Sequence, residues 1–190
     1  MVKVAKTGAT YQDVLDVPEH QIGELLDGEL FVQPRPAMPH AEATSVLSML
    51  LGPPFRLGRG GPGGWVIVFE PELHLGPDVL VPDLAGWRRS GRQGLDMSLA
   101  YQTLAPDWVC EVLSPSSQGA DRVRKLPIYA RESVGHAWLI DPLQRTLEVF
   151  RLETGHWTLI ATHDGQDKVR AEPFDAIEVP LGLLWGDELT

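Results

Sequence analysis

Four apolar, strand-like runs joined by few helices place the strongest constraint on what this chain can fold into. The runs cover residues 64–75, 79–87, 107–113 and 136–151. A helix is predicted between the last two runs, over about residues 120–132. This order of elements predicts an α/β (α+β) fold, in which helices pack on a mixed β-sheet.

Shorter elements are predicted before these runs. Residues 10–18 favour a short amphipathic helix, with Thr10 as its N-cap and Pro18 at its end. Residues 24–33 (ELLDGELFVQ) predict a hairpin, because an Asp-Gly pair supplies the turn. Prolines then interrupt the chain before a helix over about residues 40–51, where valine and leucine recur at helical spacing.

The C-terminal third is expected to continue the sheet. The fourth run contains a turn at Asp141–Arg145, which predicts that His136–Leu152 forms a hairpin against the sheet. A strand over residues 156–163 is expected to extend the sheet, and residues 173–185 are expected to form short irregular strand and turn.

Length and composition favour one compact unit. At 190 residues the chain is long enough for one full hydrophobic core and short for two, so we expect a single domain over residues 1–190. The only cysteine, Cys110, excludes an intramolecular disulfide and a cysteine-based zinc cluster. No apolar run reaches about 18 residues, and residues 1–15 lack the apolar core of a signal peptide. A cytoplasmic protein without a membrane span is therefore expected.

The net charge restricts the kind of nucleic-acid partner. The formal charge is −10 at pH 7, which counts against a simple nucleic-acid coat protein, because polyanion binding normally requires a basic surface. An acidic chain can still act on a phosphodiester if its cations are local and a metal ion supplies the remaining positive charge.

Acidic residues in two of the strand-like runs and a lysine on the following helix form a candidate site. Alternation along the second run places Asp83 on one face with Ala85. Glu111 stands among Val, Cys, Val and Leu, which is unfavourable for a buried acid unless a partner neutralises it. Asp121 and Lys125 are four residues apart on the predicted helix, so they share a face.

Two carboxylates on neighbouring strands with a nearby lysine suit hydrolysis by a hard cation. Mg²⁺ (or Mn²⁺) takes oxygen ligands, needs only one or two protein carboxylates and keeps several waters. Such an ion activates a water and offsets charge on a phosphate, and a lysine can orient that water or stabilise that charge. We therefore predict Asp83 and Glu111 as metal ligands about 3–6 Å apart, with Asp83, Glu111 and Lys125 as the catalytic residues.

The order of these motifs resembles the Uma family of restriction-endonuclease-like proteins, in the PD-(D/E)XK nuclease superfamily. The matching motifs are Pro-Asp (82–83), Glu111, Ser-Pro-Ser (114–116), and Asp, Lys and Tyr-Ala at 121, 125 and 129–130. The flanking strings also match: ELLDGEL (24–30), His40 and HAWLIDPLQRTLEVFRL (136–152). The resemblance covers nearly the whole chain and implies a restriction-endonuclease-like fold with a divalent-metal site.

Carried over residue by residue, the resemblance also shows two departures. Asp83 matches the Asp of the PD motif, and Glu111 matches the first residue of the E-x-K element. The third residue of that element is Leu113, and the family's lysine is matched by Lys125 on the following helix. Pro127 is the second departure, because this helix usually contains no proline. A kink just beyond Lys125 is therefore expected.

Structural roles are the alternatives at every position. Asp83 could close a strand, and Glu111 could be neutralised by a structural partner such as Arg122 or Lys125. Lys125 could pair with Asp121 on a solvated helix. Four residues in or beside the matching segments are candidates for the edge of the site, with surface or capping roles as the alternative: Glu24, Glu29, His40 and Asp121. Three arginines flanking the motifs are candidates for phosphate contact, with solubilising surface as the alternative: Arg88, Arg122 and Arg124. Arg131 is expected to have little part in the site.

Three functions are compatible with these residues. The leading one is a divalent-metal-dependent endonuclease that hydrolyses the phosphodiester bonds of DNA. The alternatives are a binding or assembly module that keeps the fold without efficient catalysis, and a metal-dependent hydrolase of a small phosphate ester. A homodimer is expected for a nuclease that cuts both strands, because a two-fold axis matches the symmetry of the duplex.

Overall fold

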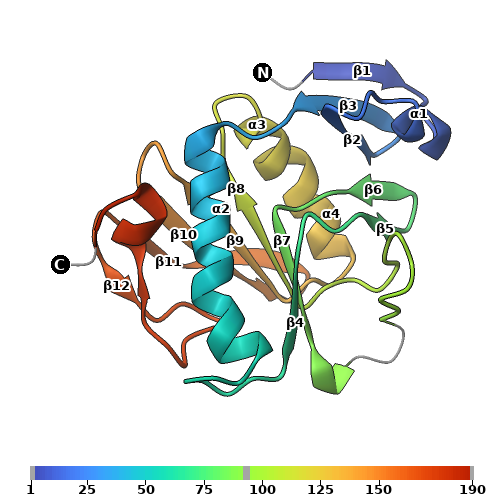
Figure 1. Ribbon diagram of the computed structural model, residues 1–190. Helices are drawn as coiled ribbons and strands as arrows, with labels where there is room; N and C mark the ends of the chain where they lie inside the picture. Colours follow the sequence, from blue (N-terminus) through green and yellow to red (C-terminus); the bar gives the residue numbers. More distant parts are fainter. Residues whose placement is uncertain (1–2, 92–94, 189–190) are drawn as a thin grey trace.

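A six-stranded mixed sheet forms the centre of the molecule. The computed structural model describes residues 3–91 and 95–188 (Figure 1). In spatial order the sheet contains β11 (His156–Asp164), β10 (Thr146–Glu153), β9 (His136–Asp141), β8 (Trp108–Val112), β7 (Leu84–Arg88) and β4 (Trp65–Phe69). β8 and β9 run parallel and every other neighbouring pair runs antiparallel. The predicted mixed sheet of an α/β (α+β) protein is confirmed.

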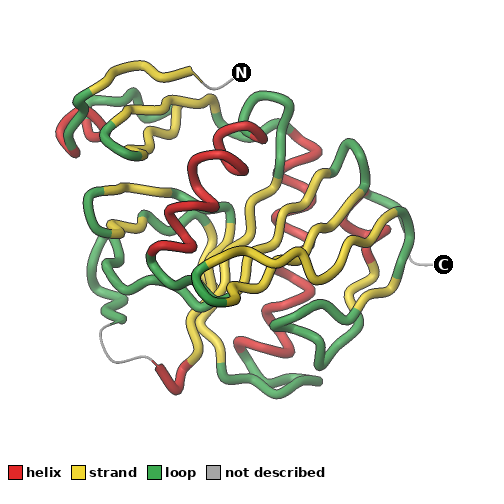
Figure 2. Tube along the Cα trace, turned by 180° about the vertical axis from the view of Figure 1, so that it is seen from behind, coloured by secondary structure: helices red, strands yellow, loops and turns green. Residues whose placement is uncertain are grey.

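Helices cover both faces of this sheet. α2 (Met38–Leu51) lies on one face, and a continuous helical segment of α3 (Gln118–Ala120), the π turn η3 (Asp121–Lys125) and α4 (Leu126–Arg131) lies on the other (Figures 1 and 2). Successive residues of β8 point to opposite faces, so Trp108, Cys110 and Val112 pack beneath α2. Val109 and Leu113 pack with α4 in the second buried cluster. Glu111 shares their face, as the alternation in this strand predicts.

A second, five-stranded sheet packs along η3 and α4, with ion pairs at Lys125 and at Arg131. Its spatial order is β1 (Lys3–Thr7), β3 (Glu29–Pro34), β2 (Gln21–Leu26), β6 (Asp78–Leu80) and β5 (Leu73–Leu75). The predicted hairpin is confirmed, with a turn at Asp27 and Gly28, where φ is +50° and +76°. Positive φ at both central residues is the geometry that selects an Asp-Gly pair. The predicted helix before it is the shorter α1 (Tyr11–Leu15), and β1 was not predicted.

The predicted strands over 64–75 and 79–87 are wrong as single strands. Each divides between the two sheets, the first into β4 and β5 and the second into β6 and β7. Glu70 at φ +41° turns the chain before Pro71, and Pro82 has no N–H to donate to a sheet. Asp83 therefore lies in the crossing segment between the sheets, one residue before β7.

Proline is accommodated within both principal helices. α2 begins at Met38, with a proline in its first turn, where a missing N–H leaves no bond unmade. In the second helical segment the Leu126 N–H donates to the carbonyl of Asp121, which makes a π turn immediately before Pro127. Helical geometry continues from this turn into α4 with a local widening of the helix, and the expected kink stays a prediction.

The C-terminal elements agree with expectation in outline. β9 and β10 form the predicted hairpin, whose turn is held by the Asp141 carboxylate, which accepts N–H bonds from Leu143 and Gln144 at 2.9 Å. β11 extends the sheet at its edge. β12 (Lys168–Val169), β13 (Val179–Pro180) and the 3₁₀ helix η4 (Leu181–Trp185) follow, and residues of this tail pack in the core beneath α2. Among the described residues, no helix has the length and apolar character needed to cross a membrane.

Candidate active site

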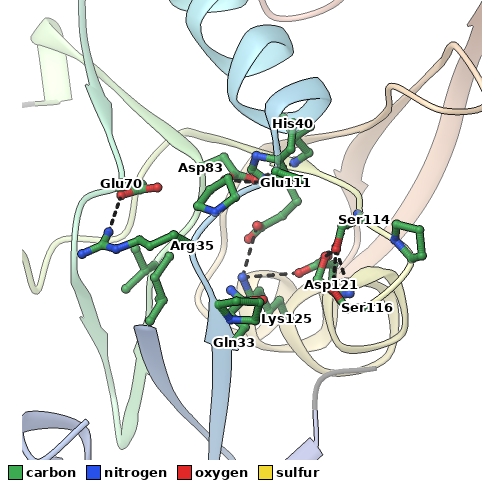
Figure 3. Close-up of a pocket in the computed structure, with 18 residues that line it drawn as sticks. Gln33, Arg35, His40, Glu70, Asp83, Glu111, Ser114, Ser116, Asp121 and Lys125 are labelled. Atoms are coloured by element: carbon green, nitrogen blue, oxygen red, sulfur yellow. Dashed lines mark hydrogen bonds and ion pairs between the residues drawn. The ribbon is translucent and has the colours of Figure 1, made fainter. Parts of the chain in front are cut away.

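A cavity of about 320 Å³ lies where the segments that link the two sheets meet the C-terminal end of β8. Figure 3 shows that its polar side chains come from segments far apart in the sequence. They fall into three groups: Gln33, Arg35 and His40; Glu70 and Asp83; and Glu111, Ser114, Ser116, Ser117, Asp121 and Lys125. The cavity thus contains all three predicted catalytic residues and two of the four predicted edge residues.

Asp83 and Glu111 face this cavity from adjacent chain segments. β7 and β8 pair with Leu84 opposite Cys110, so the next position of the same register places Asp83 opposite Glu111. Residues directly opposite in an antiparallel pair have Cβ atoms roughly 4.5–5.5 Å apart. The Val112 N–H donates to Asp83 Oδ2 at 2.6 Å and fixes the Asp83 carboxylate beside the strand that carries Glu111. The expected separation of the two carboxylates stays a prediction.

Lys125 projects from the π turn into a cluster of three carboxylates, those of Glu24, Glu111 and Asp121. Its Nζ lies 2.9 Å from Glu24 Oε1, 3.2 Å from Glu111 Oε2 and 3.4 Å from Asp121 Oδ1. Only 2% of the lysine side chain is exposed. A lysine ammonium has three N–H donors, and here three carboxylates face them. The ammonium therefore reaches Glu111 from the helix, although position 113 of the strand carries leucine.

Burial and neighbouring charges shift the pKa values of Lys125 and of the carboxylate cluster around it. Burial raises the pKa of Glu111 well above its usual range, and the charges of Asp121, Asp83 and Glu24 add to the attraction of a proton, while Lys125 acts against it. Burial lowers the pKa of Lys125, but the three carboxylates outweigh burial and hold it well above the usual value. Lys125 is therefore charged, and one ammonium offsets only part of the negative charge that the acids would carry if all were ionised. A proton or a cation at Glu111 relieves that excess.

Tyr129 fixes the other oxygen of Glu111. Its hydroxyl donates to Glu111 Oε1 at 2.6 Å, and the ring is fully buried on the same side of α4 as Lys125. Burial and the neighbouring Glu111 charge raise the pKa of Tyr129 well above its usual range, so the hydroxyl stays a donor. The sequence analysis assigned Tyr129 no role. The available signal was its spacing of four residues from Lys125, which places both side chains on one helix face.

His40 contacts Asp83 from the first turn of α2. Its Nε2 lies 3.2 Å from Asp83 Oδ1, and Nδ1 is buried without a hydrogen-bond partner among the described residues. Burial lowers the pKa of His40, but the contact with Asp83 and the charges of Asp83, Asp121 and Glu70 outweigh it and leave the pKa raised. His40 and Glu24 thus belong to the polar network around the cavity. Of the two roles that the sequence left open for them, the structure favours the edge of the site over a surface or capping role.

The remaining predicted residues lie outside the cavity. Arg124 pairs with Glu29 at 3.1 Å, and Arg122 pairs with Glu148 at 2.6 Å. The guanidinium of Arg88, at the far end of β7, stacks over the Trp65 ring at 4.6 Å. Phosphate contact by these arginines stays a prediction. Arg35, which no motif singled out, is the arginine that lines the cavity among the described residues.

Arg131 has a structural role that the sequence analysis did not expect. Its guanidinium pairs with Asp78, whose side chain is 0% exposed, and with Asp27 at 3.4 Å. Asp78 also accepts the Asp27 N–H at 2.6 Å. Arg131 therefore connects the end of α4 to the β2–β3 turn and to β6, outside the cavity, and the expectation that it has little part in the site stays a prediction.

The donor atoms of Asp83 and Glu111 fit a hard cation. Each of the four carboxylate oxygens has one hydrogen-bonding or charged partner, and each has a further lone pair. Within residues 3–91 and 95–188, no group of three or more His, Cys, Asp or Glu side chains is arranged to hold a metal ion. A cation here would be held by Asp83 and Glu111, with water or substrate oxygen as its other ligands, which is common for Mg²⁺.

Comparisons with known proteins agree on the family and the fold. Among solved structures, the crystal structure of a putative nuclease belonging to DUF820 from Anabaena variabilis ATCC 29413 matches with a TM-score of 0.74 and 22% sequence identity, over 94% of this chain and 98% of that chain. At this identity the likeness shows the fold alone. The search of curated proteins found no match. The model of the Uma2 family, described as putative restriction endonuclease, matches residues 10–182, so this chain belongs to that family.

Proposed function

We propose that this protein is an endonuclease that hydrolyses phosphodiester bonds of DNA with Mg²⁺ or Mn²⁺ held by Asp83 and Glu111. The observation that carries the proposal is the register of β7 and β8, which brings both acids to one cavity beside Lys125. When bound there, the cation would supply an activated water and offset the charge that develops on the phosphate. Membership of a nuclease family supports the reaction class.

The chain's own residues position this site. The Val112 N–H holds Asp83 Oδ2, and Tyr129 with Lys125 holds the two oxygens of Glu111. Because the three donors of Lys125 face three carboxylates, its first role is to fix Glu111 and to offset part of the negative charge. Lys125 would orient an attacking water only if one of these three contacts opened.

A nicking assay tests this proposal. Supercoiled plasmid is incubated with the protein and Mg²⁺, Mn²⁺ or EDTA, and with the variants Asp83→Asn and Glu111→Gln. We expect nicking that requires the metal and is lost in both variants. Glu178→Gln changes an exposed acid outside the cavity and is expected to cut like the wild type. Equal nicking by Glu111→Gln and the wild type would contradict the proposal.

One observation favours the binding module as a second candidate. The ammonium of Lys125 is engaged by carboxylates on all sides, and position 113 offers no lysine in its place. DNA binding with no cleavage under any metal would support this second function. Metal-dependent hydrolysis of p-nitrophenyl phosphate without DNA nicking would instead support a small phosphate ester as the substrate.

We also propose that the protein is a homodimer, through a surface other than the edge of β4. The carbonyls of Ile67 and Trp65 on this edge strand accept bonds from the side chains of Arg56 at 2.7 Å and Arg89 at 3.3 Å. A strand added here would have to displace both arginines, which is one way in which edge strands are protected. Light scattering after size-exclusion chromatography tests the dimer, and a monomer mass would contradict it.

A further inference from the structure

The cavity that accepts a phosphate in the proposed function is lined mainly by acids. Glu70, Asp83, Glu111 and Asp121 line it, and the ammonium of Lys125 is buried among carboxylates. A phosphate of a DNA strand would meet repulsion from these acids unless positive charge stands at the opening. One cation bound by Asp83 and Glu111 offsets part of that repulsion, but it does not offset the charge of Glu70.

Arg35 supplies accessible positive charge beside that acid. Among the lining residues that the structure describes, Arg35 is the arginine, and 56% of its side chain is exposed. Its Nη1 lies 3.5 Å from Glu70 Oε2, at the limit of a hydrogen bond, and its Nη2 donates to the Glu19 carbonyl at 3.0 Å. A guanidinium has five N–H donors, so most of them remain for another acceptor. Figure 3 shows Arg35 and Glu70 facing each other on the side of the cavity away from Lys125.

The backbone around Arg35 is restricted, which helps to present the side chain. Arg35 lies between Pro34, the last residue of β3, and Pro36, which precedes α2. A proline fixes its own φ and also limits the residue before it, so Arg35 has fewer backbone conformations to lose when a ligand binds. Its planar guanidinium matches two oxygens of a phosphate, and such paired bonds are stronger than the long contact with Glu70.

We propose that Arg35 binds a backbone phosphate of the substrate strand at the opening of the cavity, and that this phosphate replaces Glu70 as its partner. The inference rests on the proposed function and assigns a substrate-binding residue to the same site. Glu70 then acts as a local selector. It weakens the binding of any phosphate that Arg35 does not hold, because a carboxylate lining the cavity repels the phosphate charge.

The test compares Arg35→Ala with Arg170→Ala. Arg170 is a matched control, because its side chain is 55% exposed and it pairs with Glu178 at 4.0 Å, outside the cavity. Cleavage of a fluorescein-labelled DNA duplex is followed with Mg²⁺ at several salt concentrations. Arg35→Ala is expected to raise KM about tenfold with kcat changed by less than about twofold, and Arg170→Ala to change neither. Circular dichroism melts of all variants confirm that the fold is intact.

Two further readouts separate phosphate binding from a structural role. The slope of log KM against log salt should fall by about one in Arg35→Ala, since one phosphate contact is lost. Arg35→Lys should recover part of the affinity, and Glu70→Gln should lower KM because a repulsive charge is removed. If the wild type cleaves DNA while Arg35→Ala keeps its KM and salt slope, the assignment of Arg35 is overturned and the nuclease proposal stands. If the wild type neither cleaves nor binds DNA, the nuclease proposal is overturned first.

Discussion

Replacing Lys125 with methionine removes the ammonium from the carboxylate cluster while keeping most of the side chain's volume. Three buried acids lose their shared partner: Glu24, Glu111 and Asp121. Breaking a buried ion pair by removing one partner typically costs about 3–5 kcal/mol, because the remaining charge is buried without compensation. For a chain of this size, each kcal/mol lowers the melting temperature by about 2–4 °C. We therefore expect Lys125→Met to melt about 6–20 °C below the wild type at pH 8.

The size of this loss should depend on pH. The pKa values of the three acids are already raised in the folded protein, and removal of Lys125 raises them further. At pH 5 the acids of the variant are therefore protonated to a greater extent, and the destabilisation becomes smaller. Thermal melts followed by circular dichroism at pH 5 and pH 8 measure both values. Equal melting temperatures for variant and wild type at pH 8 would refute the claim that the Lys125 ammonium compensates three buried carboxylates. The burial of Lys125 also contradicts the alternative that it pairs with Asp121 on a solvated helix.

Three more predictions follow from the same contacts. Tyr129→Phe should weaken Mn²⁺ binding about tenfold in calorimetry and destabilise the fold by about 1–3 kcal/mol, because the buried Glu111 loses its 2.6 Å donor; unchanged affinity would remove Tyr129 from the site. Because the folded-state pKa of Glu111 is raised, protonation of Glu111 stabilises the fold. This stabilisation is complete below the unfolded pKa of about 4.3 and is lost as pH rises through the folded pKa. Mg²⁺ should therefore raise the melting temperature more at pH 8 than at pH 5, and an equal rise would argue against binding at Glu111. Arg131→Ala should destabilise the fold by about 1–3 kcal/mol in urea unfolding, because Asp78 is left buried with fewer partners; a loss below about 0.5 kcal/mol would contradict that role.

The core of the site could be predicted because its residues conflict with their local pattern. Glu111 interrupts an apolar strand, and a buried acid requires a partner. The family resemblance indicated Lys125 as the lysine of the site, and Lys125 was one of two candidate partners for Glu111. The structure adds why the helix can deliver it: Pro127 cannot donate a helical N–H, and the π turn before it holds Lys125 toward the strand. A widened turn accommodates Pro127 without ending the helix, and the kink expected beyond Lys125 stays a prediction.

Other features could not be predicted from local pattern. The run over 79–87 has the apolar character of one strand, yet tertiary packing divides it at Pro82 between two sheets. Glu24 lies in an alternating hairpin sequence that fits an exposed acid equally well, and only the packing of that hairpin on α4 buries it against Lys125. The direction of Arg35 into the cavity depends on how β3 leads into α2, which the sequence pattern does not encode.

Calorimetric titration of Mn²⁺ into the wild type and Asp83→Asn tests the central claim most directly, because it measures the metal site without relying on catalysis. The account predicts that Mn²⁺ binds the wild type and that Asp83→Asn loses this binding while melting at a similar temperature. The Val112 N–H can still donate to the remaining amide oxygen of Asn, so the local backbone should hold. Equal Mn²⁺ affinity in the two proteins, or no binding to the wild type, would contradict the account.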